Sequence, residues 1–269
     1  MNKDLLKKLE TFYINANKGL YIDEIIERDN YVLGFSKYVN DADSNFATKI
    51  NADTNNIEII ENELVEEFNI RNKELCYIIS PLSSLYNNRD SIFDEKKYDM
   101  INNEVWQIYE NLTDFKEYNN SSNITIEICE DMDLIANISF EAFNTGDSED
   151  PYGKFDKGYI ELYKNYNKNN ETKYKKEFYI IKENNEIVGC TVGTYDEEIY
   201  GIYGLAIIKK YRGKGIGTKA IKQQLKRAYE LNKRMVFLQT EDGYYPAELY
   251  RKIGFKDVCN VYYYLKKGE

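Results

Sequence analysis

Histidine is absent from this chain of 269 residues, and its absence excludes a large share of enzyme chemistry. Without histidine there is no imidazole to act as a general base and no Ser-His-Asp triad. The side chain that binds zinc most often is missing as well. The first half of the chain also holds no tight cluster of carboxylates, so we expect no metal site.

Cysteine pairs and long apolar runs are also missing. The cysteines are far apart and form no CxxC pair: Cys76, Cys129, Cys190 and Cys259. No apolar run approaches the roughly 18 to 20 residues of a membrane span. Residues 1–19 lack the apolar stretch and cleavage site of a signal peptide. We therefore expect reduced thiols in a cytoplasmic protein that does not enter a membrane.

Tyrosine, in contrast, is plentiful. Apolar residues make up 42% of the chain and aromatic residues 14%, which excludes a disordered protein. There are 26 tyrosines against 12 phenylalanines and one tryptophan, so many rings should be half-buried with a partner for the hydroxyl. The length favours two domains over one.

The charge is uneven along the chain. The net charge is −10, which argues against nucleic acid as a partner. Eight cations and no acid lie between Lys209 and Arg227, so the rest of the chain carries −18. Such a local basic segment suits a small polyanionic ligand, although charge alone leaves a solvated helix face equally open.

The polar stretch from Tyr118 to Asn123 separates two patterned regions and predicts domains 1–120 and 121–269. The second region alternates between strand and helix periodicity, which predicts a mixed α+β fold with a central sheet covered by helices. The predicted strands are 124–128, 178–182, 187–195, 199–207, 235–240 and 261–265; the predicted helices are 132–143, 159–166, 217–231 and 246–253. A loop is expected at 144–158 and a hairpin turn at 183–186.

The first region is less readable. It suggests strands at 31–36 and 75–79 and a helix at 56–68, while 99–109 fits neither type clearly. We find no cofactor motif in it and no convincing repeat of the second region.

The segment Arg212-Gly213-Lys214-Gly215-Ile216-Gly217-Thr218 lies between a predicted strand and a predicted helix. Glycines at alternate positions let the backbone approach a ligand and turn its amides inward. These amides and the positive end of the helix dipole would form a site for a diphosphate. A flexible turn is the alternative interpretation, but the glycines coincide with the basic segment and a helix start.

Two familiar phosphate motifs do not fit this loop. The Walker pattern fails because Gly217-Thr218-Lys219 has its residues in the wrong order. The Rossmann fingerprint requires GxGxxG, whereas the spacing here is GxGxG, and Glu241 would serve only loosely as the acid that binds a ribose.

The pattern RxxGxG, formed by Arg212, Gly215 and Gly217, resembles the pyrophosphate loop of the GCN5-related N-acetyltransferase (GNAT) family. A second match follows in the right order, because Leu249–Phe255 resembles the "LYxKxGF" helix and turn of that family. The resemblance covers about residues 124–267. It implies a mostly antiparallel, splayed sheet flanked by helices.

The resemblance also implies roles for individual residues. Acetyl-coenzyme A (acetyl-CoA) would be the cosubstrate, with its pantetheine arm along the backbone of Leu205, Ala206 and Ile207. The cofactor-binding loop would comprise Arg212, Gly213, Lys214, Gly215, Ile216, Gly217 and Thr218. A primary amine would attack the thioester directly, a backbone amide near Ile207 would stabilise the oxyanion, and Tyr250 would protonate the leaving thiolate.

The general base and the acceptor stay open. Glu197, Glu198, Glu241 or water could take the proton from the amine. Gly243 stands where the family often has asparagine, and Pro246 replaces the usual small residue, so the acceptor chemistry of relatives does not carry over. The acceptor is either a small molecule or a peptide amine, and the acidic remainder of the chain favours a cationic one.

Residues 1–120 would be either a degenerate acetyltransferase-like unit or an unrelated cap. A non-catalytic acyl-CoA sensor is the alternative to an enzyme, since no base is assigned. The sequence leaves open whether the protein forms a homodimer.

Overall fold

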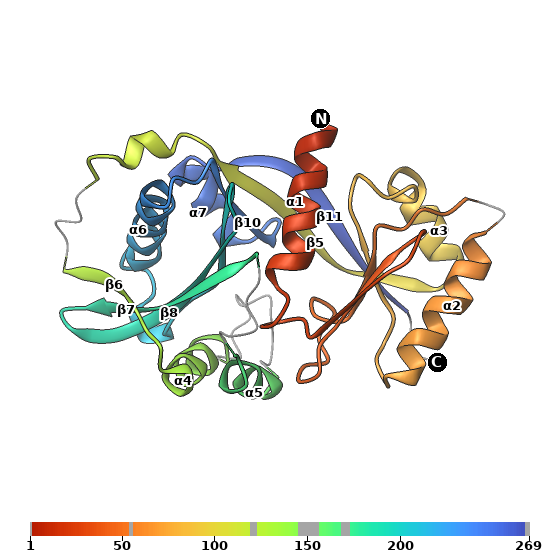
Figure 1. Cartoon of the computed structure of the whole chain (residues 1–269), viewed down its shortest axis with the longest axis horizontal. Helices are drawn as coiled ribbons and strands as arrows, with labels where there is room; N and C mark the ends of the chain where they lie inside the picture. The colour runs from red at the N-terminus through yellow and green to blue at the C-terminus, as the bar shows by residue number, and fades with distance from the viewer. Residues whose placement is uncertain (1, 54–55, 119–122, 145–155, 168–172, 267–269) are drawn as a thin grey trace. The chain divides into compact units, whose positions relative to one another are not determined.

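The computed structural model describes residues 2–53, 56–118, 123–144, 156–167 and 173–266. The chain divides into two compact units (Figure 1). Unit 1 contains residues 1–106, 239–242 and 258–269, and unit 2 contains residues 107–238 and 243–257. The domain boundary expected near residue 120 thus lies within the range of unit 2. Strands β5 (Tyr98–Tyr109), β10 (Met235–Glu241) and β11 (Lys256–Lys266) contribute residues to both units.

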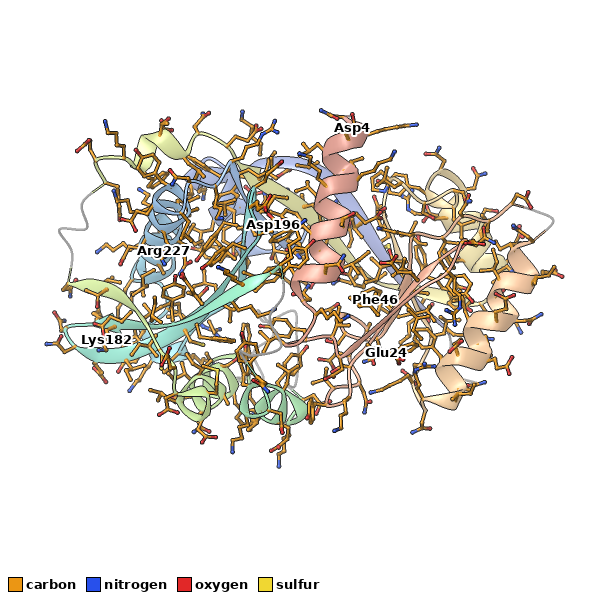
Figure 2. All side chains as sticks on the ribbon, in the orientation of Figure 1. Asp4, Glu24, Phe46, Lys182, Asp196 and Arg227 are labelled. Carbon is orange, nitrogen blue, oxygen red and sulfur yellow. The ribbon has the colours of Figure 1, made fainter. Side chains whose placement is uncertain are left out.

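Unit 1 is a mixed α/β unit. Strands β1 to β4 and β11 are adjacent in that order, and all pairs are antiparallel except the parallel pair of β3 and β4. Phe46 lies in its interior (Figure 2). Its other elements are α1 (Lys3–Ala16), β1 (Glu24–Glu27), β2 (Val32–Phe35), β3 (Phe46–Thr48), α2 (Ile57–Ile70), β4 (Cys76–Ile79) and α3 (Arg89–Glu95).

Helix α1 was not predicted from the sequence. It buries Leu6, Leu9 and Phe12, spaced three residues apart along one helical face. The side chain of Asn2 accepts hydrogen bonds from the amides of Asp4 and Leu5 and so caps the helix. Capping and an apolar face together explain why these residues are helical.

Unit 2 contains the candidate site. Strands β10, β9, β8, β7 and β6 are adjacent in that order, and all pairs are antiparallel except the parallel pair of β9 and β10. Helices α4 and α5 lie on one side of β6, β7 and β8, and α6 lies on the other (Figure 1). Its elements are β6 (Ile124–Ile128), α4 (Met132–Phe143), α5 (Gly158–Lys164), β7 (Lys175–Glu183), β8 (Glu186–Tyr195), β9 (Ile199–Ile207), α6 (Ile216–Glu230) and α7 (Tyr245–Ile253).

The expected α+β class, with a mostly antiparallel sheet flanked by helices, is confirmed. The hairpin turn predicted at 183–186 forms, with Asn184 and Asn185 at φ of 51° and 68°. Both residues are of the type that tolerates the left-handed region in a two-residue turn. The ambiguous segment 99–109 is part of a strand, β5. The predicted loop at 144–158 and the predicted seam at 118–123 lie largely outside the described residues.

Within the described ranges, no helix is both long enough and apolar enough to cross a lipid bilayer.

Candidate active site

The glycine loop connects the end of β9 to the start of α6. Gly213 and Gly215 both have a φ of +75°, which only glycine adopts without strain, and Gly215 is the N-cap of α6. A Cβ atom added to Gly213, Gly215 or Gly217 would meet no atom within 4 Å. The backbone of the loop therefore faces open space. The first-turn amides of α6 have no intrahelical acceptor, and the helix dipole makes this end positive, so the loop can bind an anion.

The cations of α6 fall into two groups. In the described part of the chain, the side chains of Lys219 and Lys222 on the first turns of the helix form no ion pair or hydrogen bond. Farther along the helix, Arg227 donates to Glu177 from Nε at 3.0 Å and from Nη2 at 2.6 Å. Lys226 donates to a backbone carbonyl at 2.7 Å. The basic segment seen in the sequence is thus partly structural, while Lys219 and Lys222 remain available to a ligand.

Arg212 is directed to the protein's own backbone. Its Nε donates to the carbonyl of Ile207 at 2.9 Å and its Nη2 donates to the carbonyl of Ala142 at 2.6 Å. These bonds attach the loop to the end of β9 and to the end of α4. These bonds give the guanidinium of Arg212 a fastening role, and the cofactor contact expected from the sequence stays a prediction.

Arg212→Lys should therefore weaken binding of the acetyl-CoA expected from the sequence as much as Arg212→Met, because a lysine cannot reach both carbonyls with one planar group. Binding of acetyl-CoA to each variant by calorimetry, at two salt concentrations, checks this. A lysine variant that binds like the wild type would show that only the positive charge of Arg212 matters.

Strand β9 is irregular at the end nearest the loop. Gly204 has a φ of +54° inside the strand, and the pairing of β8 with β9 shifts register between Cys190 and Val192. Such a bulge re-aims the backbone groups that follow it, here those of residues 205–207. The sequence analysis assigned no role to Gly204, although an isolated glycine in a strand is the usual sign of a bulge.

The parallel pairing of β9 with β10 covers three positions, where residues 199–201 face residues 235–237. Strand β9 continues beyond them to Ile207. Along the edge of β9 that faces β10, the backbone N–H and C=O groups of its last residues are therefore not paired with β10. A ligand with amide groups can bind to such a strand end as a further strand would.

Tyr250 lies on α7 and packs half-buried against Phe255, with ring centroids 5.9 Å apart. Among the described residues its hydroxyl has no hydrogen-bond partner, so the proton is available to a ligand. Burial raises the pKa of Tyr250 to about 12. The hydroxyl is therefore protonated at neutral pH and can act only as a proton donor there.

The position of α7 is fixed at both ends of the helix. Gln107 is fully buried, and its Nε2 donates to the carbonyl of Ala247 at 3.4 Å and to Asp257 at 2.7 Å. Gly254 ends the helix at a φ of +116°, and a Cβ there would lie 3.0 Å from the ring of Tyr109. These contacts hold Tyr250 in a defined place in unit 2.

Residues 136–255 match the model of the acetyltransferase (GNAT) family, and they include the glycine loop, the bulged strand end and Tyr250. They form a GNAT-family domain. An N-alpha-acetyltransferase from Sulfurisphaera tokodaii is 34% identical over 70 residues, which cover 25% of this chain and 42% of that protein. The aligned part thus spans less than half of that relative's length.

Two solved structures share the fold over nearly the whole chain. A functionally unknown conserved protein from Staphylococcus epidermidis has a TM-score of 0.68 at 15% identity, covering 97% of this chain and 98% of that one. A GCN5-related N-acetyltransferase from Kribbella flavida has a TM-score of 0.64 at 12% identity, covering 91% and 90%. At such identities the likeness concerns the fold alone, and it extends to residues before the GNAT domain.

Two of the expected base candidates do not lie near the glycine loop of the GNAT domain. Glu197 and Glu198 are exposed residues just before β9, and Glu198 lies 4.0 Å from Arg234. The loop follows the other end of β9, and nine residues of strand span about 26 Å. This placement separates both glutamates from the diphosphate loop, while the base must lie beside the amine that attacks the thioester, so the choice of base stays open.

Glu241, the third candidate, belongs to unit 1, where burial raises its pKa. The same unit contains Glu104, which accepts a hydrogen bond from the Tyr263 hydroxyl at 2.8 Å. Burial, followed by the charge of Asp43, raises the pKa of Glu104 to about 8. Glu104 was not singled out in the sequence because it lies in the ambiguous segment 99–109.

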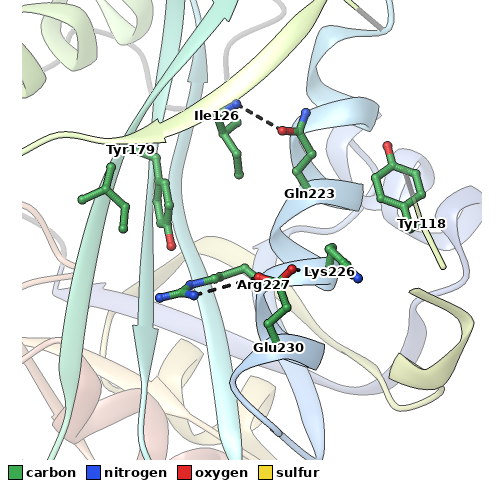
Figure 3. Close-up of a pocket in the computed structure, with 8 residues that line it drawn as sticks. Tyr118, Ile126, Tyr179, Gln223, Lys226, Arg227 and Glu230 are labelled. Carbon is green, nitrogen blue, oxygen red and sulfur yellow. Dashed lines mark hydrogen bonds and ion pairs between the residues drawn. The ribbon is translucent and has the colours of Figure 1, made fainter. Parts of the chain in front are cut away.

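A pocket of about 350 Å³ lies beside α6, between this helix and strands β6 and β7 (Figure 3). Gln223 spans it, accepting a hydrogen bond from the amide of Ile126 at 3.1 Å and donating one to the carbonyl of Ile124 at 3.2 Å. Its lining contains no residue of the glycine loop, so it is separate from the candidate active site. The lining residues are Tyr118, Ile126, Ile128, Tyr179, Gln223, Lys226, Arg227 and Glu230.

Proposed function

We propose that this chain is an N-acetyltransferase that moves the acetyl group of acetyl-CoA directly to a primary amine. The observation that carries the proposal is the glycine loop of the GNAT domain, whose backbone faces open space at the N-terminus of α6. The amides of residues 213–218 bind the diphosphate, and Lys219 and Lys222 add positive charge nearby. The pantetheine arm lies along Leu205, Ala206 and Ile207.

The reaction forms a bond from the amine nitrogen to the acetyl carbon and breaks the bond from that carbon to sulfur. A backbone amide near Ile207, past the bulge at Gly204, stabilises the oxyanion that develops in between. Tyr250 gives its proton to the departing thiolate. The amine loses its own proton to water or to one of the acids expected from the sequence, Glu197, Glu198 or Glu241.

The acceptor is proposed to be a cationic amine. The support is the distribution of charge, because the chain outside residues 209–227 carries a net −18. Acids spread over a surface attract a cationic substrate and raise its local concentration. A cytoplasmic location suits the four cysteines, all of which are free. The interpretation of residues 1–120 as a degenerate acetyltransferase-like unit stays a prediction.

The experiment is a measurement of thiol release from acetyl-CoA with polyamines, aminoglycosides, amino acids and basic peptides as acceptors. Cationic acceptors should give the highest kcat/KM, and raised salt should lower it because salt screens the attraction. Turnover of neutral or acidic amines alone would contradict the proposed acceptor class. Tight binding of acetyl-CoA without thiol release by any amine would favour a non-catalytic acyl-CoA sensor.

The pH dependence of kcat tests the state of Tyr250. With a pKa of about 12, this group keeps its proton throughout the range in which the protein can be assayed. The rate should therefore rise as the amine or its base loses a proton and then stay level up to about pH 10, with no descending limb. A descending limb between pH 8 and pH 10 that vanishes in Tyr250→Phe would show that the pKa of Tyr250 is much lower.

A further inference from the structure

A buried hydrogen bond joins β9 to α6 at a distance from the glycine loop. The hydroxyl of Tyr200, the second residue of β9, donates to Oε1 of Gln224 on α6. Both side chains are fully buried. The chain between them contains all the residues that we expect to bind the diphosphate and the pantetheine arm, from Leu205 to Thr218. The bond therefore links the strand and the helix on the two sides of the loop, at positions far from the loop itself.

Neither polar group is needed to fill the core. The other buried residues of α6 are apolar apart from the backbone: Ile216, Ala220, Ile221, Leu225 and Ala228. In the part of the chain that the structure describes, Nε2 of Gln224 is buried without a hydrogen-bond partner. A buried amide that is only half satisfied is less favourable than an aliphatic side chain in the same place. The buried amide of Gln224 should therefore make the protein less stable than an aliphatic side chain at the same position would.

A neighbouring strand makes room for the bond. Gly193 on β8 lies against the phenol of Tyr200, and a Cβ added there would come within 1.9 Å of the hydroxyl. Tyr195 stacks on the other side, with ring centroids 5.8 Å apart and planes inclined by 7°. The hydroxyl of Tyr200 therefore lies in a confined space, where it meets both Gln224 and the Tyr179 hydroxyl.

A second contact holds the same part of α6. Glu177 on β7 accepts two hydrogen bonds from Arg227 and one from the Tyr195 hydroxyl at 3.2 Å. Burial opposes ionisation of Glu177, but Arg227 and the tyrosine hydroxyls outweigh it and hold the pKa below its usual value. One turn from Gln224, α6 is thus tied to the sheet by a charged pair.

The loop at the other end of the segment is flexible by composition, since it contains Gly213, Gly215 and Gly217. Side chains at the base of the segment therefore determine where the N-terminus of α6 lies relative to the end of β9. Acetyl-CoA would bind to both elements at the same time, with its diphosphate at the N-terminus of α6 and its pantetheine arm along the end of β9. A ligand of fixed length binds well only if that spacing is right.

We propose that Tyr200 and Gln224 are positioning residues for acetyl-CoA, setting the spacing between the diphosphate amides and the strand that binds the pantetheine arm. This inference rests on the proposed function. Neither residue touches the ligand, and both act through the position of α6.

The test compares Tyr200→Phe, Gln224→Leu and the double variant, using calorimetric binding of coenzyme A and the thermal midpoint Tm. Each single change leaves one polar partner buried and unpaired, so Tm should fall. The double variant removes both partners of this bond and leaves the Tyr179 hydroxyl its hydrogen bond to Glu177, so its Tm should recover toward the wild-type value. Its Kd for coenzyme A should nevertheless stay about tenfold above the wild-type value, with kcat at saturating acetyl-CoA unchanged.

A merely structural role predicts a different result, because binding would then recover together with Tm in the double variant. That outcome would overturn the proposal. Tyr13→Phe is the matched control, since this buried tyrosine of unit 1 has its hydroxyl 3.1 Å from that of Tyr263 and should lower Tm without changing Kd. Failure of the wild-type protein to bind coenzyme A at all would instead refute the proposed function.

Discussion

Gly215→Glu should weaken the binding of acetyl-CoA at least about 100-fold, which corresponds to about 2.7 kcal/mol. The glycine has a φ of +75° and begins α6, so a glutamate there is strained and places a carboxylate beside the amides that bind the diphosphate. The new carboxylate and the diphosphate of acetyl-CoA would then compete for the same backbone amides. Isothermal titration calorimetry with acetyl-CoA measures the effect directly.

Gly19→Glu is the matched control for this substitution. Gly19 is also exposed, has a φ of +80° and has no atom within 4 Å of an added Cβ, but it lies in unit 1. The same strain and the same charge at this position should leave the Kd for acetyl-CoA unchanged. Equal loss of binding in both variants would mean that the effect of Gly215→Glu is one of general stability.

Tyr250→Phe should lower kcat by about 10²- to 10⁴-fold, the usual contribution of a positioned proton donor. The ring is retained, so packing against Phe255 persists and the Kd for acetyl-CoA should not change. Because the hydroxyl has no partner among the described residues, its removal leaves no buried group unpaired there. Steady-state turnover and calorimetric binding on the same preparation separate the two effects.

Tyr245→Phe provides the comparison on the same helix. Tyr245 is 72% exposed at the first turn of α7, and its hydroxyl too has no partner within the described residues. This variant should retain the wild-type kcat. If Tyr250→Phe kept full activity as well, water would have to protonate the thiolate, and Tyr250 would be only a packing residue.

The helices and strands of unit 2 could be predicted because their signals are local. The apolar run of residues 199–207, rich in Ile and Tyr, predicts β9, and the apolar spacing of α6 needs only its own sequence. The glycine loop is also a local signal, since three glycines precede a helix within a basic segment. Each of these features depends on residues that are close together in the chain.

Features that depend on distant residues could not be predicted. Arg212 donates to the carbonyl of Ala142, 70 residues away, and nothing near Arg212 in the sequence indicates that acceptor. The bond of Tyr200 to Gln224 likewise requires the register of β9 against α6.

Unit 1 illustrates the same limit on a larger scale. Its strand β11 is contributed by the end of the chain and pairs with β4, through residues 262–265 against residues 76–79. A reading that proceeds along the chain assigns these residues to the second domain. Helix α1 was overlooked for a different reason, since residues 1–19 were examined only for an export signal.

The most direct test of the account is a crystal structure of the protein with coenzyme A bound. The account predicts that the diphosphate oxygens accept hydrogen bonds from the amides of residues 213–218, with the pantetheine arm beside residues 205–207. A diphosphate bound elsewhere on the protein, with this loop empty, would contradict it.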